Sequence, residues 1–108
     1  MTALLVAVGG AVGATLRFLV GHHLDHDLPL GTFLVNVVGS FLLGLFTAFS
    51  LDEQLLALLG TGFCGGLTTY SAFAVQTHAL ERRGALYAAL TVLVALSACG
   101  LGFWVGQA

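Results

Sequence analysis

Four long apolar stretches, almost free of ionisable side chains, limit what this chain can fold into. Residues 1–21 contain one charged side chain, Arg17, and residues 28–51, 54–80 and 84–108 contain no Asp, Glu, Lys or Arg. Each stretch has the roughly 20 residues needed to cross a bilayer core. The chain is 7% charged, whereas a soluble domain carries about 25%. We therefore predict an all-α membrane protein with four transmembrane helices near 2–21, 29–51, 54–80 and 84–106.

The remaining charges gather in three predicted loops, at residues 22–27, 52–53 and 81–83. Pro29 suits the start of the second helix, where its missing N–H is no loss. Residues 1–108 read as one transmembrane domain, and no cleaved signal peptide is expected because no basic residue precedes the first apolar run. Three basic residues at or near the first and third loops favour both termini outside. A bias of three charges is small, and a protein inserted in both orientations would show a charge bias nearer zero.

Cysteines and histidines give weak signals. Cys64 and Cys99 lie within apolar segments without a CxxC pairing, so we interpret both as small buried hydrophobes. Three of the four histidines crowd residues 22–27 together with two aspartates. A solvated turn is the plainer interpretation of that cluster, and a metal site is the alternative.

Small and polar residues recur at helical spacing in the first two segments. Gly9 and Gly13 form a GxxxG pair that permits close helix contact, with Arg17 on the same face. In the second segment four residues spaced four apart form one stripe: Thr32, Asn36, Ser40 and Gly44. An unsatisfied amide at membrane depth costs several kcal/mol, so Asn36 must face another helix, water or a ligand. The alternative is a purely structural role for Asn36, as a hydrogen bond between helices.

The third segment contains the sequence GFCGGLTTYS at 62–71. Adjacent glycines let a backbone leave helical geometry, and nearby hydroxyls can bond the freed groups. We predict a helix broken near its middle, whose unwound carbonyls suit a cation. A glycine-packed kink is the alternative. Tyr70 and Phe73 follow on one face, and aromatic ring edges carry partial positive charge. Since Arg17 is the one ionised side chain inside a span, an anion is the better candidate for transport.

Three motifs together resemble one known family: GGAVGATLRF at 9–18, GTFLVNVVGSFLLG at 31–44 and GFCGGLTTYSAF at 62–73. Their order and spacing resemble the Fluc (CrcB) fluoride channels over essentially the whole chain. The resemblance implies a passive fluoride-selective channel, formed as an antiparallel dimer of four-helix subunits with two pores. It also implies one structural Na⁺ at the dimer centre, held by backbone carbonyls of Gly65 and Thr68.

By motif position, the resemblance also assigns the fluoride pathway. Asn36 corresponds to the family's amide donor to fluoride, and Tyr70 and Phe73 to its pair of pore phenylalanines. Arg17 corresponds to the arginine near the end of the first helix, a structural residue or one that attracts anions. Thr32, one turn before Asn36, is expected to add a pore hydroxyl.

Other polar residues bear on the same pathway. Thr91 and Ser97 could extend a polar track along the fourth helix. Tyr70 departs from the family's usual phenylalanine, and its hydroxyl could either donate to fluoride or obstruct it. That departure leaves open a heterodimer of two different subunits beside the homodimer.

The expected function is fluoride export that lowers fluoride toxicity, in a multi-pass protein of the cell membrane, expected to be a prokaryotic inner membrane. A selective pore must replace fluoride's water with donors at several weak sites. No enzymatic activity and no nucleic-acid partner are expected. A small multidrug-type, proton-coupled transporter would need a carboxylate in the first helix, and residues 1–21 contain none. A non-transporting membrane assembly subunit would leave Asn36, the broken helix and the aromatic pair unexplained together.

Overall fold

A computed structural model, described for residues 1–25, 29–69 and 71–107, is helical almost throughout. Its long helices are α1 (Thr2–Leu24), α2 (Leu30–Ala48) and α6 (Gly84–Gln107), the last preceded by the single 3-10 turn η2 (Glu81–Arg83). Three helical segments in the described residues, α1, α2 and Glu81–Gln107, are long and apolar enough to cross a membrane. An all-α membrane architecture is therefore confirmed.

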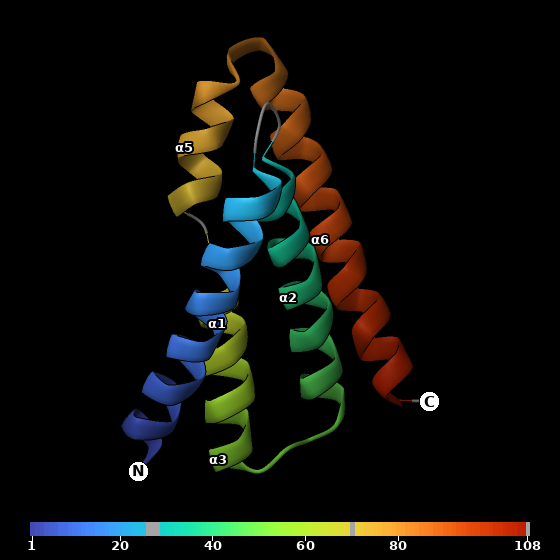
Figure 1. The fold of residues 1–108 in the computed structure, drawn as a ribbon. Coiled ribbons are helices and arrows are strands. Elements are labelled where there is room, and N and C mark those ends of the chain that lie inside the picture. Colours follow the sequence, from blue (N-terminus) through green and yellow to red (C-terminus); the bar gives the residue numbers. More distant parts are fainter. Residues whose placement is uncertain (26–28, 70, 108) are drawn as a thin grey trace.

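The third apolar segment differs from the other three. A short α3 (Glu53–Leu55), a π-helix η1 (Leu56–Cys64) and α4 (Gly65–Leu67) follow one another directly, and a separate α5 runs over Ser71–Ala79. Between them Thr68 is extended, with φ −81° and ψ 158°. Neither part alone has the length of a membrane span. Figure 1 shows α5 above and apart from the segment that begins at α3.

The sequence suggested that the interruption begins at the two glycines. In the structure it begins after them. Gly65 has helical angles, φ −63° and ψ −39°, and Gly66 lies inside α4. Helical structure ends one turn later, because the Thr69 N–H bonds to the Asn36 side chain rather than to a carbonyl of its own helix. The interruption therefore lies within the segment 62–71 and near the middle of 54–80, as predicted, but it follows the two glycines rather than starting at them.

Two predicted helix boundaries also need correction. The first helix continues through His22 and His23 to Leu24, so these residues do not belong to the loop. The second helix ends at Ala48 rather than near residue 51, since Ser50 turns into the left-handed region with φ 54°. Asp52 then starts the next helix by accepting a hydrogen bond from the Leu55 N–H at 2.8 Å.

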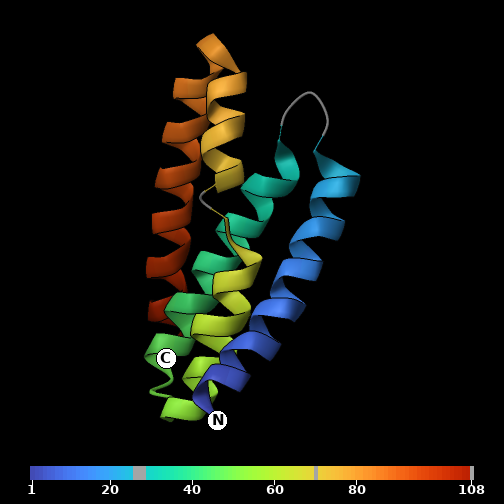
Figure 2. The same cartoon turned by 90° about the vertical axis from the view of Figure 1, so that its left-hand side faces the viewer.

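The helices form two closely packed pairs. α1 packs mainly against η1 and α4, and α2 packs most extensively against α6 (Figures 1 and 2). A Cβ on Gly9 or Gly13 would overlap backbone atoms of η1 or of Phe63 and Leu67, so the predicted close contact at this GxxxG pair is confirmed. Gly44 and Gly102 play the same role between α2 and α6. Both chain termini lie at the lower end of Figure 1.

Buried apolar side chains are few. Val35, Ala57, Cys64 and Leu67 are the buried hydrophobic residues of the described chain. By contrast, large apolar side chains of α6 lie on its outer face, with Leu86 63% and Leu96 66% exposed. Few buried and many exposed apolar side chains fit a protein that is surrounded by lipid. In such a protein, close packing of small residues replaces a large hydrophobic core.

Candidate functional site

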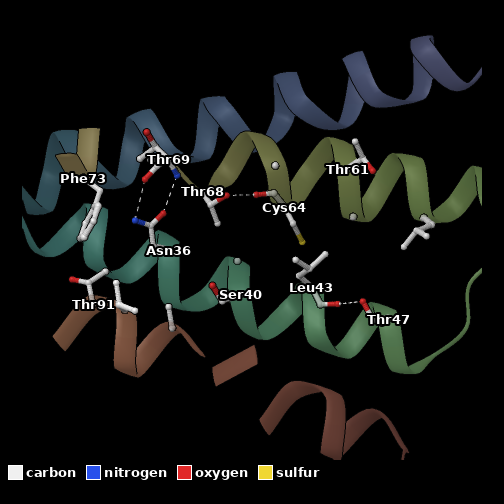
Figure 3. A pocket seen from close by; sticks show the side chains of 16 residues that line it. Asn36, Ser40, Leu43, Thr47, Thr61, Cys64, Thr68, Thr69, Phe73 and Thr91 are labelled. Atoms are coloured by element: carbon white, nitrogen blue, oxygen red, sulfur yellow. Dashed lines mark hydrogen bonds between the residues drawn. The ribbon is translucent and has the colours of Figure 1, made fainter. Parts of the chain in front are cut away.

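An open groove runs along α2 beside η1 and α4 and ends at α5 and α6 (Figure 3). Its volume is about 660 Å³. Polar side chains are concentrated there although the chain is mostly apolar. The polar lining consists of Asn36, Ser40, Thr47, Thr61, Cys64, Thr68, Thr69 and Thr91. No Asp, Glu, Lys or Arg is among the lining residues described.

The predicted polar stripe of α2 lies only partly in this groove. Asn36 and Ser40 line it, and Leu43 and Thr47 continue the same face of the helix (Figure 3). Gly44 instead packs against the Cys99 carbonyl of α6. The stripe therefore serves two purposes: its middle faces the groove, and its far end allows α6 to approach.

Asn36 is clamped to the backbone where the third segment is interrupted. Its Nδ2 donates to the Thr69 carbonyl at 3.1 Å, and its Oδ1 accepts from the Thr69 N–H at 2.8 Å (Figure 3). A side-chain amide has two N–H groups, so this clamp leaves one N–H of Asn36 for a further acceptor. The amide thus closes the interruption and retains a donor at the groove.

The clamp also changes the bonding of α4. In a continued α-helix, the Thr69 N–H would bond to the Gly65 carbonyl. Here it is occupied by Asn36, and among the described residues no donor to the Gly65 carbonyl is present. Gly65 is exposed, and a Cβ placed on it would meet no atom within 4 Å. A carbonyl oxygen at such an open position fits a hard cation such as Na⁺.

Thr68 completes this turn of the chain. Its N–H and its hydroxyl both donate to the Cys64 carbonyl, at 3.0 Å and 2.9 Å. The extended backbone of Thr68 then carries its own carbonyl out of the helical direction. Gly65 and Thr68, the two residues expected to hold Na⁺, therefore both lie at the groove beside the interruption.

A second, smaller cavity of about 310 Å³ lies on the other side of Thr69. It contains the other two expected pathway residues, Arg17 and Thr32, together with Asp25. The Arg17 Nε donates to the Gly66 carbonyl at 3.1 Å, which ties α1 to α4. Thr32 is 5% exposed, and its hydroxyl donates to Asp25 Oδ2 at 3.1 Å. That hydroxyl would have to release Asp25 before it could donate to an anion.

Aromatic and hydroxyl groups gather where the groove meets α5 and α6. Phe73 lines the groove and lies 5.6 Å from the Tyr87 ring, centroid to centroid, at an interplanar angle of 35°. Thr91 is 3% exposed and also lines the groove. Ser97 is exposed and is not part of the lining. Tyr70 lies outside the described residues.

Three contributors were not predicted from the sequence. Thr69 offers only its backbone to Asn36, and a backbone role leaves no side-chain signal. Asp25 was read as part of a solvated loop, but its carboxylate accepts hydrogen bonds from both α2 and α5. Gln76 supplies the α5 donor from 51 residues away, a separation at which no local pattern indicates contact.

Comparison with known proteins places this chain in a family. The family described as CrcB-like protein, Camphor Resistance (CrcB), matches residues 4–107. A Rhodococcus jostii (strain RHA1) protein named fluoride-specific ion channel FluC 2 is 56% identical over 110 residues, 95% of this chain and 96% of its own.

More distant relatives carry related names. The fluoride-specific ion channel FluC of Thermococcus gammatolerans is 42% identical, covering 97% of this chain and 95% of its own. That of Pyrococcus abyssi is 41% identical, covering 94% and 93%. Each match spans nearly the whole of both chains. With its three apolar helices capable of spanning a membrane, this chain is a multi-pass membrane protein that belongs to the CrcB family.

Proposed function

We propose that this protein is a passive, fluoride-selective ion channel that exports fluoride from the cytoplasm and lowers its toxicity. The observation that carries the proposal is the polar groove at the interrupted third segment, in a chain that is otherwise apolar. The names of the relatives, fluoride-specific ion channels, indicate which anion it conducts.

The chemistry of the groove suits a small, strongly hydrated anion. Asn36 keeps one N–H that the Thr69 clamp does not use, and it lines a groove that also holds several hydroxyls. The edge of the Phe73 ring adds partial positive charge. Because the described lining has no Lys or Arg, the ion would meet weak donors rather than one trapping charge, which conduction requires. The hydroxyls of Thr47, Thr68 and Thr91 donate to backbone carbonyls four residues earlier, so each would have to turn from that carbonyl to bond the ion. Arg17, in the adjacent cavity, would attract anions toward the entrance.

A second subunit would complete the pathway. The groove is open along one side, and Gly65 is an exposed residue of its lining. We propose that a second copy, inserted in the opposite orientation, covers this side and encloses two pores. In each copy, α3 to α4 and α5 together would form the third of four spans. A heterodimer with a related subunit is the alternative.

Structural Na⁺ would lie where the two subunits meet. The carbonyls of Gly65 and Thr68 are its proposed ligands, supported by the open space at Gly65 and the displaced hydrogen bond of Thr69. When bound, Na⁺ would offset the partial negative charge of backbone oxygens at the interruption. Fluoride itself needs no energy source, since an inside-negative potential drives an anion outward through an open pore.

The test is ion efflux from liposomes that contain this protein alone. Fluoride and chloride release are recorded with ion-selective electrodes under the same gradient. Rapid fluoride loss without chloride loss is the expected result. If a folded sample releases no fluoride, the homodimeric channel proposal fails. Restoration of flux by co-reconstitution with a second, related subunit would then favour the heterodimer.

A further inference from the structure

Asp25 connects three parts of the molecule that are distant in sequence. Its Oδ1 accepts from the Thr32 N–H at 3.1 Å. Its Oδ2 accepts from the Thr32 hydroxyl at 3.1 Å and from Gln76 Nε2 at 3.2 Å. The carboxylate follows the end of α1 and therefore joins α1, the first turn of α2 and the middle of α5.

One of these bonds has a simple structural role. Pro29 precedes α2 and provides no side-chain cap. Thr32 is the third residue of α2, and its N–H is one of the donors left unpaired at a helix start. Asp25 therefore acts as the missing cap for α2. A cap alone, however, needs no contact with α5.

The Gln76 bond gives Asp25 a second role. Thr32 lies one turn before Asn36 on α2, and Gln76 lies three residues after Phe73 on α5. Residues three or four apart share a helix face. Asp25 thus links the two helices one turn beyond the two expected pathway residues. It also fixes which end of the Gln76 amide faces the carboxylate, since a carboxylate only accepts hydrogen bonds.

We propose that Asp25 is a positioning residue for anion conduction, which holds α5 against α2 so that the Phe73 ring and the Asn36 amide keep a fixed spacing. This inference rests on the proposed fluoride channel. Its carboxylate lines the cavity that also contains Arg17 and Thr32, and the donors that surround it offset its charge. The bracing bond, rather than the charge alone, is what conduction needs.

Fluoride and chloride efflux from liposomes can separate this brace from the cap. Gln76→Met removes the α5 bond and leaves the Asp25 cap of α2 intact. We expect fluoride flux to fall roughly tenfold, the effect of losing one hydrogen bond to a charged group. Fluoride selectivity over chloride should fall with it, because spacing rather than stability is altered. Asp25→Ala should lower flux at least as much.

A variant that restores the bond provides the decisive test. The double variant D25N/Q76E exchanges the carboxylate and the amide, and Asn is as good a helix cap as Asp. Flux and selectivity should return toward the wild-type values. Asp52→Asn is the matched control: that carboxylate caps the helix at Leu55 and does not line the groove, so its flux should not change.

Wild-type flux in Gln76→Met, or no recovery in D25N/Q76E, would overturn the positioning role while leaving the channel proposal intact. If the wild-type protein conducts no fluoride, the channel proposal fails instead. The brace is then tested by thermal unfolding of Asp25→Ala, of Gln76→Met and of the variant that combines these two substitutions. Effects larger together than in either alone but less than additive would support a direct bond. Strictly additive effects would overturn it.

Discussion

Gly65 and Gly66 are neighbours in the third apolar segment, but they face opposite surroundings. A Cβ on Gly66 would overlap the backbone of Gly10 on α1, whereas a Cβ on Gly65 would meet nothing within 4 Å. Gly65 therefore lies beside open space within one chain, and Gly66 lets two helices touch. One side of this segment is a tight structural contact, and the other is the wall of a polar groove.

The same contrast separates the two halves of the molecule. Between α1 and the segment formed by η1 and α4, the contact is made by glycines and by the Arg17 bond to Gly66. Between α2 and the interruption it is made by the Asn36 amide and the Thr69 backbone. Close packing of backbone against backbone gives a rigid support, while polar groups beside an open groove give donors. We therefore expect substitutions on the two sides to fail in different ways.

The largest effect is expected on the tight side. Gly66→Val places two methyl groups against the Gly10 backbone, which cannot move aside as a side chain could. Overpacking of this kind costs roughly 1–3 kcal/mol or more, so the variant should lose its folded, monodisperse form. Size-exclusion chromatography and thermal unfolding in detergent measure this. A variant with the wild-type unfolding temperature would show that α1 does not pack there.

Gly65→Val should act on assembly rather than on the protomer fold. Its side chain would enter open space within one chain but would occupy the surface proposed to meet the second subunit. We expect dimer affinity to fall roughly tenfold or more, measured by single-molecule photobleaching in liposomes. Equal effects of valine at positions 65 and 66 would remove the distinction between the two faces.

Na⁺ removal tests the open side without a mutation. If Gly65 and Thr68 carbonyls hold Na⁺ at the dimer centre, replacing Na⁺ by N-methyl-D-glucamine should lower the unfolding temperature. A ligand at a hundred times its Kd stabilises by about 2.7 kcal/mol. Thermal unfolding across a Na⁺ titration measures it, with Gly65→Val as the variant that should not respond. A Na⁺-independent wild-type curve would contradict the proposed site.

The smallest effect is expected on α6. Thr91 lines the groove, and Ser97 on the same helix is exposed elsewhere. The Thr91 hydroxyl donates to the Tyr87 carbonyl at 2.7 Å and would have to leave it to bond the ion. Thr91→Val should therefore slow fluoride efflux at most about fivefold, the value of one neutral hydrogen bond of about 1 kcal/mol. Ser97→Val should leave efflux unchanged. The reverse result would place the anion path on a different face of α6.

Much of the fold could be predicted because membrane spans leave a strong local signal. Stretches with no charge, or with Arg17 alone, located α1, α2 and α6, and the GxxxG spacing indicated the contact at Gly9 and Gly13. The exact end of α4 was not predictable from propensity, since glycines keep helical angles where a neighbouring helix holds them. The interruption depends instead on Asn36, which lies 33 residues from Thr69.

The candidate site was predictable in part for the same reason. A polar side chain at membrane depth is conspicuous, which identified Asn36, and the aromatic spacing and the motif at 62–73 identified Phe73. The structure brings both to one groove. Thr32 shares its helix face with Asn36 but lines the neighbouring cavity. Asp25 was assigned to a solvated loop because an aspartate among histidines carries no sign of its partners. Long-range contacts of this kind, such as the bond from Gln76, require the three-dimensional structure.

The most direct test of the central claim, that the groove at the interrupted segment carries fluoride, is efflux through Asn36→Leu. The substitution removes two hydrogen bonds to Thr69 and the remaining amide donor. We predict that fluoride efflux from liposomes falls at least about 100-fold while the protein stays dimeric. Efflux at the wild-type rate from such a dimer would contradict the account.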